Sequence, residues 1–217
     1  MLRILSLCLL LALSACATLP EPQPVNAHSH ELWRQQVSRL KPLDQWSIRG
    51  RVAVYVEEDV YNLGMSWQRR GMNSTLKLEA SLGQGLIKLE KNENSVQLTT
   101  AEGESVHGHN AQQVLHETTG LLIPVEGLET WIKGIPHEQT DFRHGIDGDG
   151  NTRTLQQDGW HINYLDFTLA NPQFAEQLTL PRRLYMKHGK LALKIVIDQW
   201  QNKPQQNQTD LFPTLPN

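Results

Sequence analysis

The chain has 217 residues, of which 39% are hydrophobic, and carries a formal net charge of −3 at pH 7. This length and composition predict one domain with a sizeable core. The mean hydropathy is −0.45, and no stretch after residue 16 is apolar enough to span a membrane. Lysines and arginines are scattered along the sequence, which argues against nucleic acid as a partner and against an electrostatic grip on anionic lipid.

Residues 1–15 are predicted to be a lipoprotein signal peptide. Arg3 precedes an apolar run over residues 4–13, which is too short for a membrane-spanning helix of about 20 residues. The ending Leu-Ser-Ala-Cys resembles the lipobox of bacterial lipoproteins, which makes Cys16 the expected lipid-attachment site and first mature residue. An ordinary secretory signal is the alternative. Because Cys8 leaves with the signal and Cys16 is acylated, we expect no disulfide.

Residues 16–28 are expected to form the lipidated N-terminus and a linker. Pro20, Pro22 and Pro24 favour an extended, semi-rigid spacer. Several acyl chains anchor a protein stably in a membrane, whereas a single acyl chain binds the membrane only marginally. The residue after the cysteine is Ala17 and not Asp, which resembles lipoproteins of the outer membrane. We therefore expect the domain to be anchored in the inner leaflet of that membrane and to face the periplasm.

The first predicted element of the domain is a helix from Ser29 to Leu40. Trp33 and Val37 lie on the same helical face as Leu40, at spacings of four and three. Ser29 can cap the start, and Pro42 forbids continuation. The pattern indicates an amphipathic helix of about three turns.

Beyond the helix the hydrophobic period changes to two, which predicts half-buried strands. Turn residues at 69–73 and 91–94 favour an antiparallel meander, and a sheet this long should curl. The inner-face residues of the first three runs are Trp46, Ile48, Gly50, Val52, Val54 and Val56, then Tyr61, Leu63, Met65 and Trp67, then Leu76, Leu78, Ala80 and Leu82. Further strands are expected at 86–90, 96–99, 142–146, 152–156, 160–165, 182–187 and 191–197.

The helical period returns between residues 110 and 136. Asn110 is a predicted N-cap with Gln113 at the capping-box position, and Gly120 ends this helix. Pro124 opens a second helix, which the Gly-Ile-Pro sequence at 134–136 stops. Its inward residues are Leu128, Trp131, Ile132 and Ile135. Since these helices are too few to cover every strand, a curved sheet around them could enclose an apolar pocket.

No catalytic constellation is found in the sequence. It has no Gly-x-Ser-x-Gly elbow, no His-Glu-x-x-His and no free mature thiol, so an anchored hydrolase is a weak alternative. His107, His109 and His116 could ligate a metal, but no acidic or thiol partner is obvious nearby, and a polar strand end is the favoured interpretation. We expect neither a metal nor any other cofactor.

Residues 147–151 resemble the start of a calcium loop. Asp147, Asp149 and Asn151 hold its first, third and fifth positions, and Asp158 holds the twelfth, but Thr152 replaces the sixth-position glycine. Asp-Gly pairs also favour the positive φ angles of hairpin turns, and strands flank the segment. A turn is therefore predicted.

The loop after the third run places a large apolar residue, Leu82, beside Gly83 at an expected tip. Incidental exposure of Leu82, or its folding under the loop, is the alternative to a functional role. Trp46, Trp67 and Trp131 on the inner faces fit a packed core at least as well as a binding role.

These features together resemble the LolB family, over about residues 32–200. They are the lipobox, the helix with Trp33, the opening Trp46-Ser47-Ile48-Arg49-Gly50-Arg51, the Leu82-Gly83 loop and, above all, the segment Gly120–Pro136 that reads GLLIPVEGLETWIKGIP. The resemblance implies an outer-membrane receptor, not an enzyme, that accepts lipoproteins from a periplasmic LolA-like carrier. It also implies a mainly β fold, a curved antiparallel half-barrel of about eleven strands closed by about three helices, over residues 29–200.

The resemblance further implies an apolar cavity for the acyl chains of the lipoprotein cargo. The residues expected to line it are Trp46, Ile48, Val52, Val54, Leu63, Met65, Trp67, Leu76, Leu78, Leu128, Trp131 and Ile132. Leu82 and Gly83 are implied to form a loop that enters membrane lipid, although Ser81 stands where family members often have Pro. We expect a monomer and a disordered tail over 201–217. A tethered, lipocalin-like binder of small apolar ligands is the alternative function.

Overall fold

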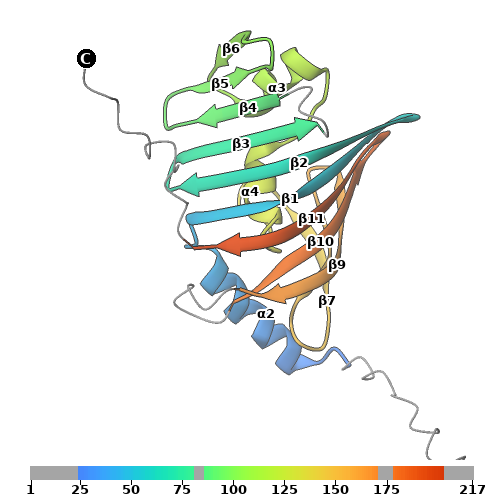
Figure 1. Ribbon diagram of the computed structural model, residues 1–217. Coiled ribbons are helices and arrows are strands. Elements are labelled where there is room, and N and C mark those ends of the chain that lie inside the picture. Colours follow the sequence, from blue (N-terminus) through green and yellow to red (C-terminus); the bar gives the residue numbers. More distant parts are fainter. Residues whose placement is uncertain (1–23, 81–85, 171–177, 203–217) are drawn as a thin grey trace, which may run out of the picture.

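The computed structural model describes residues 24–80, 86–170 and 178–202, and these form one antiparallel sheet of 11 strands with three helices. The sheet order is β6-β5-β4-β3-β2-β1-β11-β10-β9-β8-β7. β1 is therefore central, and the last strand, β11, pairs with it. The sheet curves strongly and stays unclosed between β6 and β7, with α4 on its concave side (Figure 1). The predicted half-barrel is confirmed.

The strands of the β1–β6 half run in hairpin order. They are β1 (Gln45–Val56), β2 (Asp59–Arg70), β3 (Asn73–Ala80), β4 (Leu86–Lys91), β5 (Val96–Thr99) and β6 (Ser105–Gly108). The other half comprises β7 (Phe142–Ile146), β8 (Thr152–Gln157), β9 (Trp160–Leu169), β10 (Thr179–His188) and β11 (Leu191–Gln201). β11 continues through Gln201, so the predicted boundary of the tail at residue 201 is too early.

Helix α2 (Ala27–Leu40) begins two residues before the predicted start. Asn26 is the cap, because its side-chain oxygen accepts the backbone N–H groups of His28 and Ser29. Ser29 stands at the third helical position, and its hydroxyl donates to the carbonyl oxygen of Gly148 at 2.8 Å. The Ser29 oxygen also accepts the backbone N–H of Asn26 at 3.2 Å, so this residue completes the capping box and anchors the helix to the β7–β8 turn.

Helix α3 (Ala111–Thr119) has the predicted ends, and α4 (Val125–Trp131) begins after Pro124 as predicted. The predicted stop of α4 at 134–136 is too late, because the N–H groups of Lys133 and Gly134 bond to carbonyl oxygens only three residues back and tighten the chain into turns. The Asn110 side chain accepts the backbone N–H of Gln113 at 2.8 Å, and Gly120 ends α3 with a φ of 76°, which glycine adopts without strain. The side chain of Gln113 donates to Glu117 rather than back to the cap.

The strands pack their inner side chains into one core. The ring of Trp46 lies edge-on to the rings of Trp67 and Trp200, with centroids 5.3 and 5.9 Å away. At Gly50 a register shift brings β11 so close that a Cβ would lie 2.1 Å from the carbonyl oxygen of Val196. No helix within residues 24–80, 86–170 and 178–202 is long and apolar enough to cross a membrane.

Candidate functional site

Nine of the residues predicted to line an acyl-chain cavity lie on the concave face of β1, β2 and β3, and the other three, Leu128, Trp131 and Ile132, belong to α4 and its C-cap. Val52 faces Leu63, and Met65 faces Leu78, across antiparallel pairs in which opposite residues point to the same side. Leu63 and Leu78 are partly buried and the other ten predicted residues are buried. All twelve belong to one connected set of apolar side chains. The structure therefore brings the predicted set together, and its contact with acyl chains stays a prediction.

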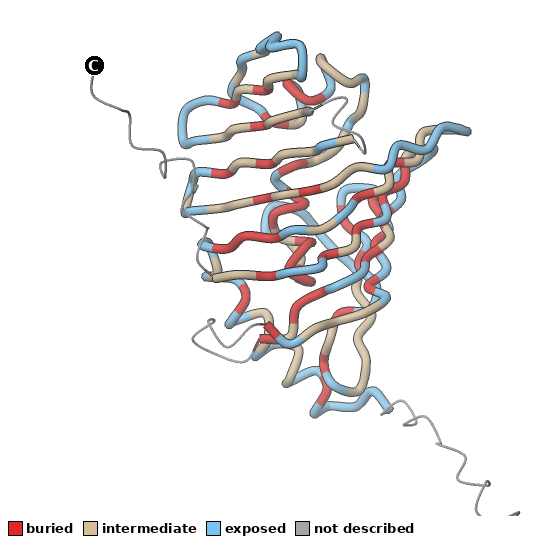
Figure 2. Tube along the Cα trace, in the orientation of Figure 1, coloured by how far each residue is buried: buried red, intermediate tan, exposed pale blue. Residues whose placement is uncertain are grey.

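Burial on this face decreases toward one end of the strands. On β2, Trp67 is fully buried and Leu63 is only partly buried, and on β3, Leu76 is buried and Leu78 is only partly buried. Tyr61, the next inward residue of β2, is 53% exposed. Figure 2 shows the change from buried residues at the centre of the sheet to exposed residues at the tip of the β1–β2 hairpin. We call the partly buried apolar set here the rim: Val56, Leu63, Leu78, Ile87 and Leu191.

Helix α4 is held on the concave face by hydrogen bonds from two strands. The indole Nε1 of Trp131 donates to Gln157 Oε1 on β8, and the hydroxyl of Tyr164 on β9 donates to the carbonyl oxygen of Trp131, both at 2.8 Å. Complete burial raises the pKa of Tyr164, so its hydroxyl remains a donor. Gly127 is required because a Cβ there would lie 2.9 Å from the Trp131 ring.

A buried cluster of charges pins α4 to the other half of the sheet. The carboxylate of Glu129, 3% exposed, accepts a hydrogen bond from Arg69 Nη1, and the Nζ of Lys91 lies 2.8 Å from its Oε1. The sequence pattern placed Arg69 and Lys91 in turns, which is wrong for both. Arg69 is the last but one residue of β2 and continues the inward alternation of Met65 and Trp67. Lys91 is the last residue of β4 and continues the inward alternation from Leu89.

Lys133 follows α4 and joins it to α2. Its Nζ donates to the carbonyl oxygens of Leu40 and Leu43 at 3.0 and 3.1 Å. Burial, followed by the nearby Arg69 charge, lowers the pKa of Lys133 to about 8. Nothing in the sequence singled out this lysine, because its two acceptors are backbone atoms far away in the chain.

A cleft of about 830 Å³ lies between α2, α4 and residues 135–142. Trp33 and Val37 supply apolar wall, and Arg69 and Glu129 bring the buried charges to its surface. Much of the lining comes from residues 124–136, which are part of the segment Gly120–Pro136 that most resembles the LolB family. The cleft mixes charged and apolar groups, so it differs in chemistry from the apolar concave face.

The candidate calcium loop at residues 147–151 forms a turn in the structure. The Oδ1 of Asp147 accepts the N–H groups of Asp149 and Asn151, and its Oδ2 lies 2.9 Å from Arg153 Nε. The predicted turn is confirmed there, and Gly150 allows α2 to pack closely. Within the described part of the chain no three His, Cys, Asp or Glu residues are placed to hold a metal ion. Cys16, Leu82 and Gly83 lie outside the described residues.

Comparison with known proteins assigns this arrangement to a family. The family described as outer membrane lipoprotein LolB matches residues 44–200, which span both halves of the sheet and α4. The chain belongs to the LolB family.

Curated relatives of this chain carry the name outer-membrane lipoprotein LolB. The one from Alkalilimnicola ehrlichii is 33% identical over 196 residues, covering 89% of this chain and 94% of its own length. The one from Nitrosococcus oceani is 30% identical over 193 residues, covering 88% and 93%. A solved structure of a DUF1329 family protein from Desulfovibrio piger superposes with a TM-score of 0.49 at 6% identity, covering 83% of this chain and 93% of that one.

Membership in the LolB family decides the broad class of function. The chain is a lipoprotein of the outer membrane that acts in lipoprotein localisation. It is a trafficking protein and not an enzyme, which removes the anchored hydrolase from consideration. The family also favours this role over a lipocalin-like binder of small ligands.

Proposed function

We propose that this LolB-family chain accepts acylated lipoproteins from a LolA-like periplasmic carrier and inserts them into the outer membrane. The observation that carries the proposal is the concave face, on which one continuous apolar surface runs from a buried centre to a partly exposed rim. The acyl chains of the cargo lipoprotein would lie against this face during transfer. The transfer itself needs no energy source if each step leads to a site of higher affinity.

The energetics favour a sheltered transfer. Each methylene of an acyl chain left in water costs about 0.8 kcal/mol, so a carrier must offer apolar area of similar size. The rim supplies the first apolar contacts for an incoming chain, because Leu63 and Leu78 are already partly accessible. Deeper contacts with Met65 and Leu76 require side chains or α4 to move. Transfer from carrier to receptor to bilayer then follows a gradient of affinity.

Two features outside the described residues complete the proposed mechanism. Lipid on Cys16 anchors the chain, and the loop with Leu82 and Gly83 enters the leaflet during delivery. The connection that contains this loop leaves β3 at Ala80 and returns at Leu86, which is the rim end of the strands. A leucine entering lipid there would lie beside the route by which acyl chains leave.

Mixing the unacylated chain with a carrier loaded with a labelled lipoprotein tests the proposal. Cargo should move to the chain without any added energy source. The matched variants are Leu78→Gln on the rim and Lys77→Gln, its neighbour on the outer face of β3. Only the first should lower transfer. Failure of the unaltered chain to take cargo from any loaded carrier would contradict the receptor function.

A further inference from the structure

Three neighbouring strands carry a concentrated positive charge on the outer, convex face of the sheet. β1, β11 and β10 are adjacent, and their inward residues are buried in the core, so the alternate residues point outward. Asp198 is the only acidic residue on these three strands. Their exposed cations are Arg49, Arg51, Arg182, Arg183, Lys187 and Lys194. We call these six residues the basic face.

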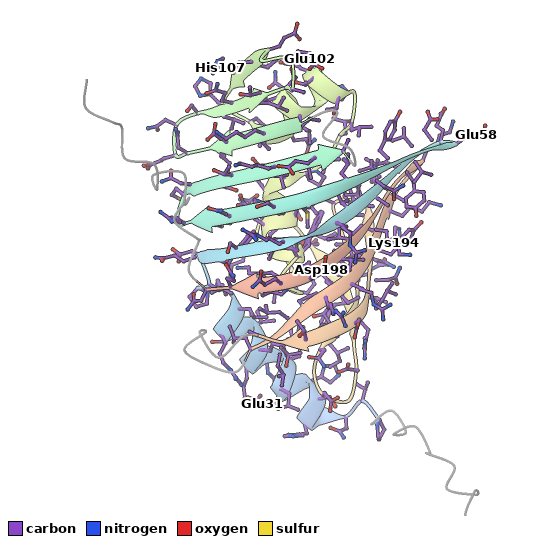
Figure 3. All side chains as sticks on the ribbon, in the orientation of Figure 1. Glu31, Glu58, Glu102, His107, Lys194 and Asp198 are labelled. Carbon is purple, nitrogen blue, oxygen red and sulfur yellow. The ribbon has the colours of Figure 1, made fainter. Side chains whose placement is uncertain are left out.

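The strand register brings these charges together from distant parts of the sequence. Arg51 on β1 and Arg183 on β10 both register with Val196 of β11, which separates them by two strand spacings, or about 10 Å. Lys194 lies two residues along β11 and registers with Tyr185. Figure 3 shows Lys194 and Asp198 on the face of the sheet opposite α4. Cations that are scattered in the sequence are therefore close in the fold.

Within residues 24–80, 86–170 and 178–202, two aspartates lie in ion pairs with Arg51, Arg182 and Arg183 of this face. Asp198 lies 3.2 Å from Arg51, and Asp166 of β9 lies 3.2 Å from Arg183 and 3.7 Å from Arg182. Six cations and two aspartates give a local net charge of 6 − 2 = +4 on a chain whose formal charge is −3.

The other half of the sheet is not charged in this way. On β3 and β4, Lys77 and Lys88 alternate with Glu79 and Glu90, and the Nζ of Lys88 lies 2.8 Å from Glu90. Opposite signs therefore balance on β3 and β4, in contrast to β1, β10 and β11.

We propose that the basic face binds the anionic phospholipid headgroups of the membrane in which the chain is anchored. This inference rests on the proposed function in one respect, the acyl anchor on Cys16. The anchor keeps the domain beside the leaflet, so its effective concentration is high and weak attraction suffices. Each Lys or Arg close to an anionic surface adds to this attraction. Tyr55 and Tyr185, partly buried between the cations, have the amphipathic character suited to a lipid interface.

The test uses the acylated protein reconstituted into vesicles of phosphatidylethanolamine, with or without phosphatidylglycerol. A polarity-sensitive fluorophore is attached through Gln199→Cys, an exposed position on β11 opposite Arg49. A control label is attached through Glu117→Cys, which is exposed on α3. The Gln199 label should report a less polar environment only when phosphatidylglycerol is present, and high salt should reverse the change. The Glu117 label should not respond.

Two matched double variants distinguish an effect of the basic face from an effect of the total charge of the chain. Arg183→Gln with Lys194→Gln removes one ion-paired and one unpaired cation of the basic face. Lys77→Gln with Lys88→Gln does the same on β3 and β4. Only the Arg183→Gln, Lys194→Gln double variant should lower the ratio of molecules whose basic face contacts lipid to molecules whose basic face does not. The expected decrease is roughly fivefold per cation and roughly 25-fold in total.

Three outcomes would overturn the proposal, and they are distinguishable. A Gln199 label that ignores phosphatidylglycerol, or equal effects of both double variants, removes the specific lipid contact. Substitutions that spare the lipid signal but weaken binding of a loaded carrier make this face a protein-docking surface. Salt that releases the whole protein from vesicles shows instead that the acyl anchor of the proposed function is missing.

Discussion

The Nζ of Lys133, just after α4, donates a hydrogen bond to the carbonyl oxygen of Leu40, the last residue of α2, at 3.0 Å. Leu43 supplies a second carbonyl acceptor. This single side chain ties the helix in the concavity to the helix that follows the proposed membrane linker. A shift of α4 to admit acyl chains would therefore have to stretch or break this connection.

Lys133 should make stability depend on pH at the alkaline side. Its pKa is about 8 in the folded chain against 10.5 ordinarily, so between these values the unfolded chain binds more protons. The free energy of unfolding contributed by this group therefore rises as pH increases from 8 to 10.5. Urea unfolding of the unaltered chain and Lys133→Met at several pH values should show a difference in stability that grows across this range. Parallel curves would contradict the assignment.

Removal of the Glu129 carboxylate should be strongly destabilising. Glu129→Leu leaves Arg69 and Lys91 as uncompensated cations in a mostly buried site, which costs about 3–5 kcal/mol in comparable buried pairs. The control, Arg51→Gln, breaks an exposed pair with Asp198 and should cost less than about 1 kcal/mol. Chemical unfolding measures both. Similar losses in the two variants would show that the buried cluster has no special role.

Leu78→Gln should weaken acyl-chain binding more than it weakens the fold. Leu78 is only partly buried at the rim, so a polar side chain there can reach water while the apolar contact with cargo is lost. We expect severalfold weaker binding of a labelled lipoprotein at nearly unchanged thermal stability. Leu76→Gln, at a buried position of the same strand, should instead lower stability by about 2 kcal/mol or more. The prediction is wrong if the rim variant binds cargo normally.

Leu82→Glu should leave folding and cargo uptake intact and block delivery to the membrane. A carboxylate at the loop tip would oppose entry into the hydrocarbon region, whereas the concave face is unchanged. Transfer from the preloaded chain to vesicles is the measurement. Met72→Glu, 62% exposed at the β2–β3 turn on the opposite end of the strands, is the matched control. Normal delivery by the Leu82 variant would remove the loop from the mechanism.

The local elements were predictable because their signals are local. Alternation of apolar residues indicated strands such as β1 and β2, and the caps at Asn110 and Gly120 set the ends of α3. The start of α2 was predicted two residues late, because Asn26 and Ser29 are both competent caps and the sequence alone does not rank them. Pro181 was left outside a strand, but β10 accommodates it at a register shift.

The sequence by itself determined which strand residues share the inner face, because a period of two decides which side chains point to the same side. Its motifs determined the family, and the resemblance to that family implied the half-barrel. Only the tertiary structure decided how charges meet. Glu129 reaches Arg69, 60 positions away, and Arg51 comes to lie near Arg183 through strand pairing. Such contacts depend on the register between strands that are distant in the sequence and on the curvature of the sheet. Neither the register nor the curvature can be predicted from a short pattern of residues.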